Sequence, residues 1–205
     1  MSPESDSSHS APPSDLQYVK VSLLGALLRP RQTLEPCLAH QYIPFTAMWA
    51  VLSAAGMAFY TMLPIYPRPD FEFNDFLATL GLLSPLIGLI VLRMAAWVLA
   101  KSGKFFGGKA NTRLCHGALA VGLLPIGCSL FISLPLFILY PNERLMEVVG
   151  FLGLAQVIGT IWSLVNVVNA VAVVHQIKSF HAGVALMGMI GFMYAVLRLL
   201  GMFMG

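Results

Sequence analysis

Three pairs of cysteine or histidine residues are the strongest candidates for metal chemistry in this 205-residue chain. The pairs are Cys37 with His40, Cys115 with His116, and His175 with His181. Thiolates and imidazoles are the side chains that bind zinc or copper in proteins. However, the CxxH spacing of the first pair is common, two adjacent residues chelate one ion poorly, and histidines also suit a membrane edge. We therefore predict no metal site and no bound cofactor.

A recognisable arrangement of catalytic groups is missing from the sequence. There is no nucleophile with an adjacent base, no carboxylate pair and no dinucleotide-binding fingerprint. The glycine-rich segment 101–113 (KSGKFFGGKANTR) lacks the residue order of a phosphate-binding P-loop. Its basic residues favour contacts with anionic headgroups at the cytoplasmic face: Lys101, Lys104, Lys109 and Arg113. We predict that the chain is not an enzyme, and we expect no nucleic-acid partner.

Two arginines, Arg93 and Arg198, lie inside strongly apolar segments. An arginine at the centre of a bilayer costs about 2.5–3.5 kcal/mol to insert, so such residues are candidates for function. Both are also close enough to a segment end to extend their guanidinium groups toward the headgroups. No carboxylate lies within the apolar segments, although Glu35 could reach Arg93 in the folded chain. The functional and the structural interpretations both remain open.

A polar stripe follows one face of the apolar segment 148–174. Its members at helical spacing are Gln156, Gly159, Thr160, Ser163 and Asn166, and Asn169 lies somewhat off that line. Polar groups surrounded by lipid must face protein or water. The stripe therefore indicates either a substrate path or hydrogen bonding between helices. Close packing favours the second alternative, because small residues recur every four positions at Ala155, Gly159 and Ser163, and in another segment at Ala50, Ala54 and Ala58.

The elements that must position these residues are membrane-spanning helices. Hydrophobic residues make up 58% of the chain and charged residues 10%, and the mean hydropathy is +0.79. A soluble domain has about 25% charged residues, and a spanning helix needs roughly 20 apolar residues. We predict an all-α bundle of five spans, 42–205, and expect a kinked or split third span because it contains Pro125 and Pro135. The predicted spans are 42–63, 76–100, 114–140, 148–174 and 182–203.

The basic residues predict the orientation of the bundle. Eight Lys and Arg residues fall in the segments on one side and two on the other, while Arg93 and Arg198 lie inside spans. The eight are Lys20, Arg29, Arg31, Lys101, Lys104, Lys109, Arg113 and Lys178, and the two are Arg68 and Arg144. Loops rich in Lys and Arg remain in the cytoplasm. We therefore predict a cytoplasmic N-terminus and a C-terminus outside, most consistent with a bacterial inner membrane.

The N-terminal region divides into two parts. Residues 1–15 are rich in Ser and Pro and lack the features of a signal peptide, so we predict a disordered tail. Residues 16–41 are predicted to form short helices at the cytoplasmic interface, because apolar residues recur at near-helical spacing and the segment is too short to span. The Pro30 ring should end the first of these helices, with a second running from Thr33 toward His40.

Several short motifs give the chain a resemblance to the Yip domain family, the Ypt/Rab-interacting five-span membrane proteins, and to its prokaryotic branch in particular. The likeness covers roughly residues 20–203. It rests on Leu28–Arg29–Pro30 with Thr33, Phe106–Gly107–Gly108–Lys109, Leu124–Pro125, Ile161–Trp162 and a turn that contains His175. Eukaryotic relatives are linked to Rab GTPases through longer cytoplasmic N-terminal regions. This chain has only about forty residues there, so a Rab partner is not expected.

Two functional hypotheses follow from these features. The first is a non-enzymatic membrane scaffold that recruits protein partners, associates with itself or organises the lipid bilayer. The second is a small transporter or channel subunit that uses the polar face of the fourth span together with Arg93 or Arg198. The second hypothesis draws on the broken helices that many transporters place at membrane depth.

Overall fold

The secondary structure of the described residues is helical throughout. The computed structural model describes residues 22–39, 43, 45–62, 84–139 and 145–204. Two short helices come first, α1 (Leu23–Leu28) and α2 (Pro30–Ala39). The longer helices are α3 (Thr46–Met62), α5 (Ser84–Phe105), α6 (Thr112–Gly122), α7 (Leu124–Leu139), α8 (Leu145–His175) and α9 (Ser179–Met204). The predicted all-α class is confirmed for the described part of the chain.

Four helical stretches are long and apolar enough to cross a bilayer. They are Leu86–Phe105, Thr112–Leu136, Gly150–His175 and Ser179–Val196. In chain order, these stretches correspond to the second, third, fourth and fifth predicted spans. They identify the chain as a multi-pass helical membrane protein. The first eight residues of the second predicted span, 76–83, lie outside the described residues.

The first predicted span, 42–63, is described as a helix from Thr46 to Met62, while residues 42, 44 and 63 lie outside the described residues. These 17 residues cover about 26 Å of a hydrocarbon core that is roughly 30 Å thick, and the apolar stretch Thr46–Phe59 is shorter still. Phe45 has a positive φ of 57°, a left-handed conformation that cannot continue the helix toward the N-terminus. The described helices therefore supply four full spans rather than five.

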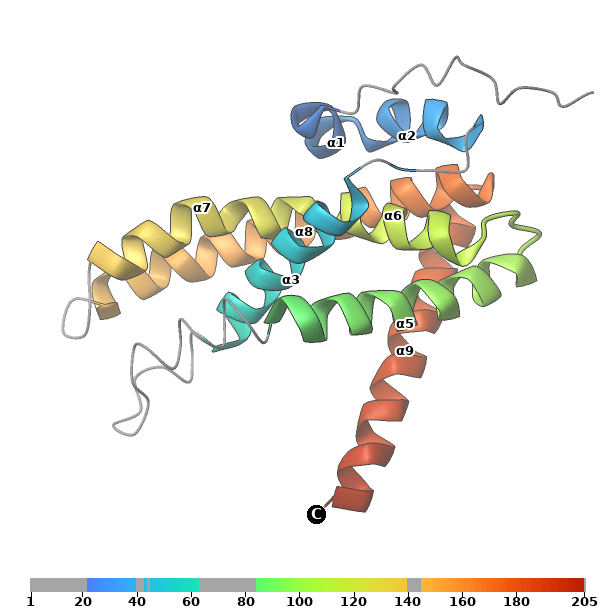
Figure 1. The fold of residues 1–205 in the computed structure, drawn as a ribbon. Coiled ribbons are helices and arrows are strands. Elements are labelled where there is room, and N and C mark those ends of the chain that lie inside the picture. Colours follow the sequence, from blue (N-terminus) through green and yellow to red (C-terminus); the bar gives the residue numbers. More distant parts are fainter. Residues whose placement is uncertain (1–21, 40–42, 44, 63–83, 140–144, 205) are drawn as a thin grey trace, which may run out of the picture.

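The third span is split, as its prolines predicted. α6 ends at Gly122, α7 begins at Leu124, and the two helices run one after the other along α8 (Figure 1). Pro125 lies in the first turn of α7, where a missing backbone N–H costs no helical hydrogen bond. The break therefore falls before Pro125, at Leu123, which caps α6.

The connection between the second and third spans is shorter than the predicted loop 101–113. α5 continues to Phe105 and α6 begins at Thr112, which leaves only residues 106–111 between them. Lys101 and Ser102 are compatible with a helix that extends beyond the hydrocarbon. The chain reverses only at Gly107, whose φ of 79° is readily available to glycine.

The lead-in helices α1 and α2 pack along the outside of the bundle (Figure 1). Ser22 caps α1 by accepting a hydrogen bond from the Gly25 backbone N–H at 3.0 Å. Ala26, Leu34 and Cys37 are fully buried. Two short helices within 16–41 are therefore present, although the second begins at Pro30 rather than Thr33. The predicted tail 1–15, residues 16–21 and His40 lie outside the described residues.

Small residues allow the long helices to approach one another closely. A side chain on Gly56 would overlap the backbone at Ile126 on α7, and one on Gly88 would overlap Ala54 across the α3–α5 contact. On the other side of the bundle, Gly122 of α6 lies against Val167 of α8. These contacts are the small-residue packing expected of helices in a membrane.

Candidate functional site

The largest fully buried polar side chain among the described residues lies at the end of α8. The His175 ring is fully buried, and side chains added at Gly103 and Gly108 would overlap it. Its Nε2 lies 3.3 Å from the Sγ atom of Cys115 on α6. The His175 backbone oxygen accepts a hydrogen bond from the Lys109 N–H at 3.2 Å. The turn after α8 is therefore held against both the loop 106–111 and the start of the third span.

This arrangement is a packing centre more than a reactive one. The Nδ1 atom of His175 is buried and makes no hydrogen bond within the described part of the chain. The Cys115 thiol is also fully buried, so the pair has no exposed reactive atom. A cysteine–histidine nucleophile requires access for its substrate and a group that orients the imidazole. The full burial of both side chains leaves no access for a substrate.

The three cysteine and histidine pairs that were considered as metal ligands are only partly brought together. Of the six residues, the structure joins Cys115 with His175, whereas His181 stacks on the Phe106 ring with centroids 5.5 Å apart. Cys37 is buried in α2, where burial raises the pKa of its thiol. His40 lies outside the described residues. Among the described residues, no group of three potential ligands converges on one point.

Two members of the predicted polar stripe make hydrogen bonds between helices. The Ser163 hydroxyl accepts the Ile126 backbone N–H at 3.1 Å, and the Asn166 amide nitrogen donates to the Leu27 carbonyl at 2.8 Å. Ile126 lies in the first turn of α7, where backbone N–H groups have no partner inside the helix. Ser163 therefore satisfies a donor that the break before Pro125 exposes. These are the contacts that the packing interpretation of the stripe requires.

A third contact on α8 was not predicted. The indole N–H of Trp162 donates to the same Leu27 carbonyl, at 3.1 Å. The sequence analysis used Trp162 only as part of a family motif. A single sequence gives no sign that two positions 135 residues apart are in contact. The two remaining stripe amides, Gln156 and Asn169, are half-buried and make no hydrogen bond to another described residue.

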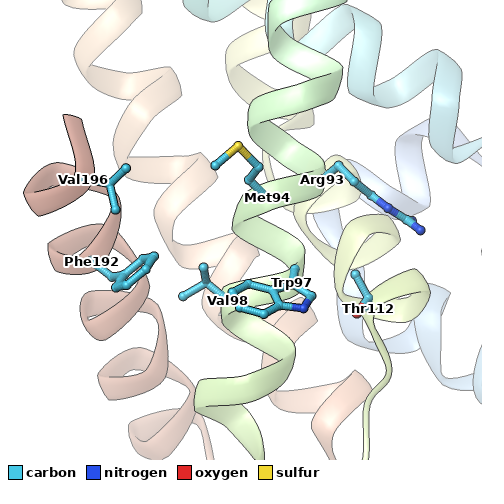
Figure 2. A pocket seen from close by; sticks show the side chains of 7 residues that line it. All are labelled: Arg93, Met94, Trp97, Val98, Thr112, Phe192 and Val196. Atoms are coloured by element: carbon cyan, nitrogen blue, oxygen red, sulfur yellow. The ribbon is translucent and has the colours of Figure 1, made fainter. Parts of the chain in front are cut away.

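The two intramembrane arginines lie in different surroundings. Arg93 is exposed on α5 and lines two hollows of about 520 Å³ and about 400 Å³. The larger hollow lies between α5, the start of α6 and α9 (Figure 2). Arg198 is exposed on α9, with its guanidinium carbon 5.7 Å from the centre of the Tyr194 ring. Glu35 is exposed on α2 and forms no ion pair with Arg93 in the structure.

Most residues that line the larger hollow were not predicted as site residues by the sequence analysis. It is lined by Arg93, Met94, Trp97, Val98, Thr112, Phe192 and Val196. The apolar members have no polar signal that distinguishes them from residues facing bulk lipid. Of the set, only Arg93 was singled out.

The four predicted cytoplasmic-face residues are close together in the structure. Lys101 and Lys104 are exposed on the last turns of α5, Lys109 on the loop 106–111, and Arg113 on the first turn of α6.

Comparison with protein-family models, curated proteins and solved structures gives no match for this chain.

Proposed function

We propose that this chain is a non-enzymatic membrane scaffold of the Yip type, which recruits protein partners, associates with itself or organises the bilayer. In this proposal it is a five-span bundle in a bacterial-type inner membrane, with a cytoplasmic N-terminus. In this proposal α3 makes the fifth crossing. The family part of the proposal is motivated by the motifs between residues 20 and 203.

The observation that carries the proposal is the attachment of α1 to the side of α8. Trp162 and Asn166 both donate hydrogen bonds to Leu27, at the end of α1. The opposite surface of α1 is apolar, because Leu24 and Leu28 are 67% and 58% exposed. A six-residue helix is about 9 Å long, so it can occupy only one leaflet. An apolar helix inserted on one side of a membrane perturbs that leaflet alone.

The elements that carry the predicted cytoplasmic residues supply a charged surface for recruitment. Seven described basic residues are exposed on the α1–α2 region, the end of α5, the loop 106–111, the start of α6 and the α8–α9 turn. They are Arg29, Arg31, Lys101, Lys104, Lys109, Arg113 and Lys178. Glu35 is the only acidic residue described on these elements. A surface of this kind attracts acidic protein segments and anionic headgroups.

Crosslinking in native membranes tests the recruiting function. The full-length chain is crosslinked, solubilised in mild detergent and captured, and its partners are identified and counted. We expect a stoichiometric partner or a second copy of the chain. The combined variant Lys101→Gln, Lys104→Gln and Lys109→Gln should reduce capture, because it removes exposed charge without shortening the side chains.

Arg198→Gln is the matched control, since it removes an exposed cation from α9, far along the chain from the basic surface. Its capture should equal that of the unmodified chain. Repeated recovery of a lone monomer, together with no lipid-dependent phenotype on deletion, would contradict the scaffold function.

A small transporter or channel subunit is the second candidate, and the hollows beside Arg93 are the observation in its favour. This candidate has less support, because Ser163 and Asn166 form hydrogen bonds with α7 and α1 instead of lining a transport path. Flux assays in liposomes decide between the candidates. Anion or solute flux that Arg93→Gln abolishes would favour transport over the scaffold, whereas absence of flux would favour the scaffold.

A further inference from the structure

We propose that Arg93 and its two flanking hollows bind one anionic phospholipid, with the headgroup phosphate on the guanidinium and apolar chain in the hollows. This site does not depend on the scaffold function, because a lipid can be held whether or not a protein partner is recruited. Its parts come from α5, α6 and α9, and α5 packs against both of the other two helices.

The charge at the site calls for an anion. Arg93 is exposed on a spanning helix and makes no hydrogen bond or ion pair to another described residue. A guanidinium can donate two parallel hydrogen bonds to a phosphate, which makes arginine well suited to this group. Figure 2 shows the Arg93 side chain extending from α5 toward the side where α6 begins. Thr112 and His116, on the first turns of α6, each line one of the hollows beside it.

The shape of the site fits one headgroup and apolar chain. The larger hollow is walled mainly by Met94, Val98, Phe192 and Val196, and Figure 2 shows the last two reaching from α9 toward α5. The smaller hollow is walled by Leu89, Ile90, Met94 and His116. Arg93 belongs to both hollows, which follow one another along α5, the larger beside Trp97 and Val98 and the smaller beside Leu89 and Ile90. A phospholipid offers one charge for the guanidinium and apolar chain for the hollows.

The apolar lining favours a lipid phosphate over a free one. A strongly hydrated inorganic phosphate would lose its water beside methyl and aromatic groups that return no hydrogen bonds. A lipid brings apolar chains that replace the water in both hollows. An arginine that simply extends to the membrane surface would not depend on the hollows beside it, so the effect of filling one hollow separates the two interpretations.

The test uses the full-length chain in nanodiscs of phosphatidylglycerol or phosphatidylcholine, with the melting temperature as the readout. We expect a higher melting temperature in phosphatidylglycerol, because a ligand bound only to the folded state stabilises it. Arg93→Gln should reduce that difference, while Arg198→Gln, which removes an exposed arginine that lines neither hollow, should preserve it. Equal melting temperatures in the two lipids, or equal losses in the two variants, would overturn the proposal. Stabilisation by inorganic phosphate in phosphatidylcholine would also overturn it, in favour of a free-anion site.

The acyl-chain hollow is tested separately by native mass spectrometry of co-purified lipid. Val196→Trp fills the larger hollow, and Ile190→Trp places the same indole at an exposed position of α9 that lines neither hollow. We expect Arg93→Gln to lower retained phosphatidylglycerol by about tenfold, the effect of losing one charge-assisted contact. Val196→Trp should also lower it, because the indole occupies the place of the acyl chain. Ile190→Trp should retain the lipid. Retention by Val196→Trp at the unmodified level would contradict the placement of the chain.

Discussion

At the scale of single residues, the described polar groups in the spans mostly stabilise contacts between helices. His175 fills the space left by Gly103 and Gly108 and touches Cys115, while Ser163 satisfies a backbone donor at the start of α7. Each of these residues would be a candidate for chemistry from its type alone. Their surroundings show that they fix the positions of loops and helix ends.

Replacing Gly103 with alanine should destabilise the protein. Alanine normally favours a helix over glycine by about 0.5–1 kcal/mol, but a side chain here would overlap the His175 ring. Overpacking typically costs about 1–3 kcal/mol, so we expect a lower melting temperature in detergent. Gly188→Ala is the matched control, because it lies in helix α9 with open space beside it and should be neutral or stabilising. An equal response of the two variants would contradict this account of the His175 contact.

Removing the Ser163 hydroxyl should also lower stability. Ser163→Ala leaves the Ile126 N–H buried without its partner, which should cost about 1–2 kcal/mol. Thr160→Val on the exposed side of the same helix removes a hydroxyl with no such role and should leave the melting temperature almost unchanged. If Ser163→Ala melts at the same temperature as the unmodified chain, then the bond contributes nothing measurable to the break in the third span.

At the scale of elements, the attachment of α1 depends on α8. Asn166→Leu should release the end of α1, because it removes one of two donors to the Leu27 carbonyl. Hydrogen exchange should then become faster at the backbone amides of α1, while exchange in α5 stays slow. Asn169→Leu, which removes an amide without a described hydrogen-bond partner, should leave α1 protected. Unchanged protection of α1 in Asn166→Leu would show that packing alone holds this helix.

The sequence predicts the helices well and their partners poorly. Apolar length identified α5, α8 and α9 within several residues, and Pro125 marked the break between α6 and α7. The extension of α5 to Phe105 was missed, because Lys101 and Ser102 mark a membrane edge but do not end a helix. The contacts of Leu27 with Trp162 and of Cys115 with His175 join distant positions. One sequence contains local periodicity but no record of which faces meet.

At the scale of the whole molecule, most of the exposed basic residues lie on the short helices α1 and α2 and around the connections at the ends of α5 and α8. The outer faces of the long helices are apolar. α9 packs on α5 near its start, where the Ser102 hydroxyl bonds the Ala185 carbonyl at 3.4 Å. Its later part leaves the other helices at a steep angle (Figure 1), with Tyr194 and Met202 exposed. A membrane around these faces explains why so many large apolar side chains are exposed on the outside of the helix bundle.

The central claim is that the basic segments all lie on the cytoplasmic side of the membrane. Labelling single cysteines from each side of the membrane tests it most directly. Single-cysteine variants Lys109→Cys and Asp70→Cys, in a chain whose three native cysteines are replaced by alanine, are treated with a membrane-impermeant maleimide in intact cells and in opened membranes. The account predicts labelling of Asp70→Cys in intact cells and of Lys109→Cys only after the membrane is opened. Labelling of both variants from the same side would contradict the proposed five-span, basic-side-in arrangement.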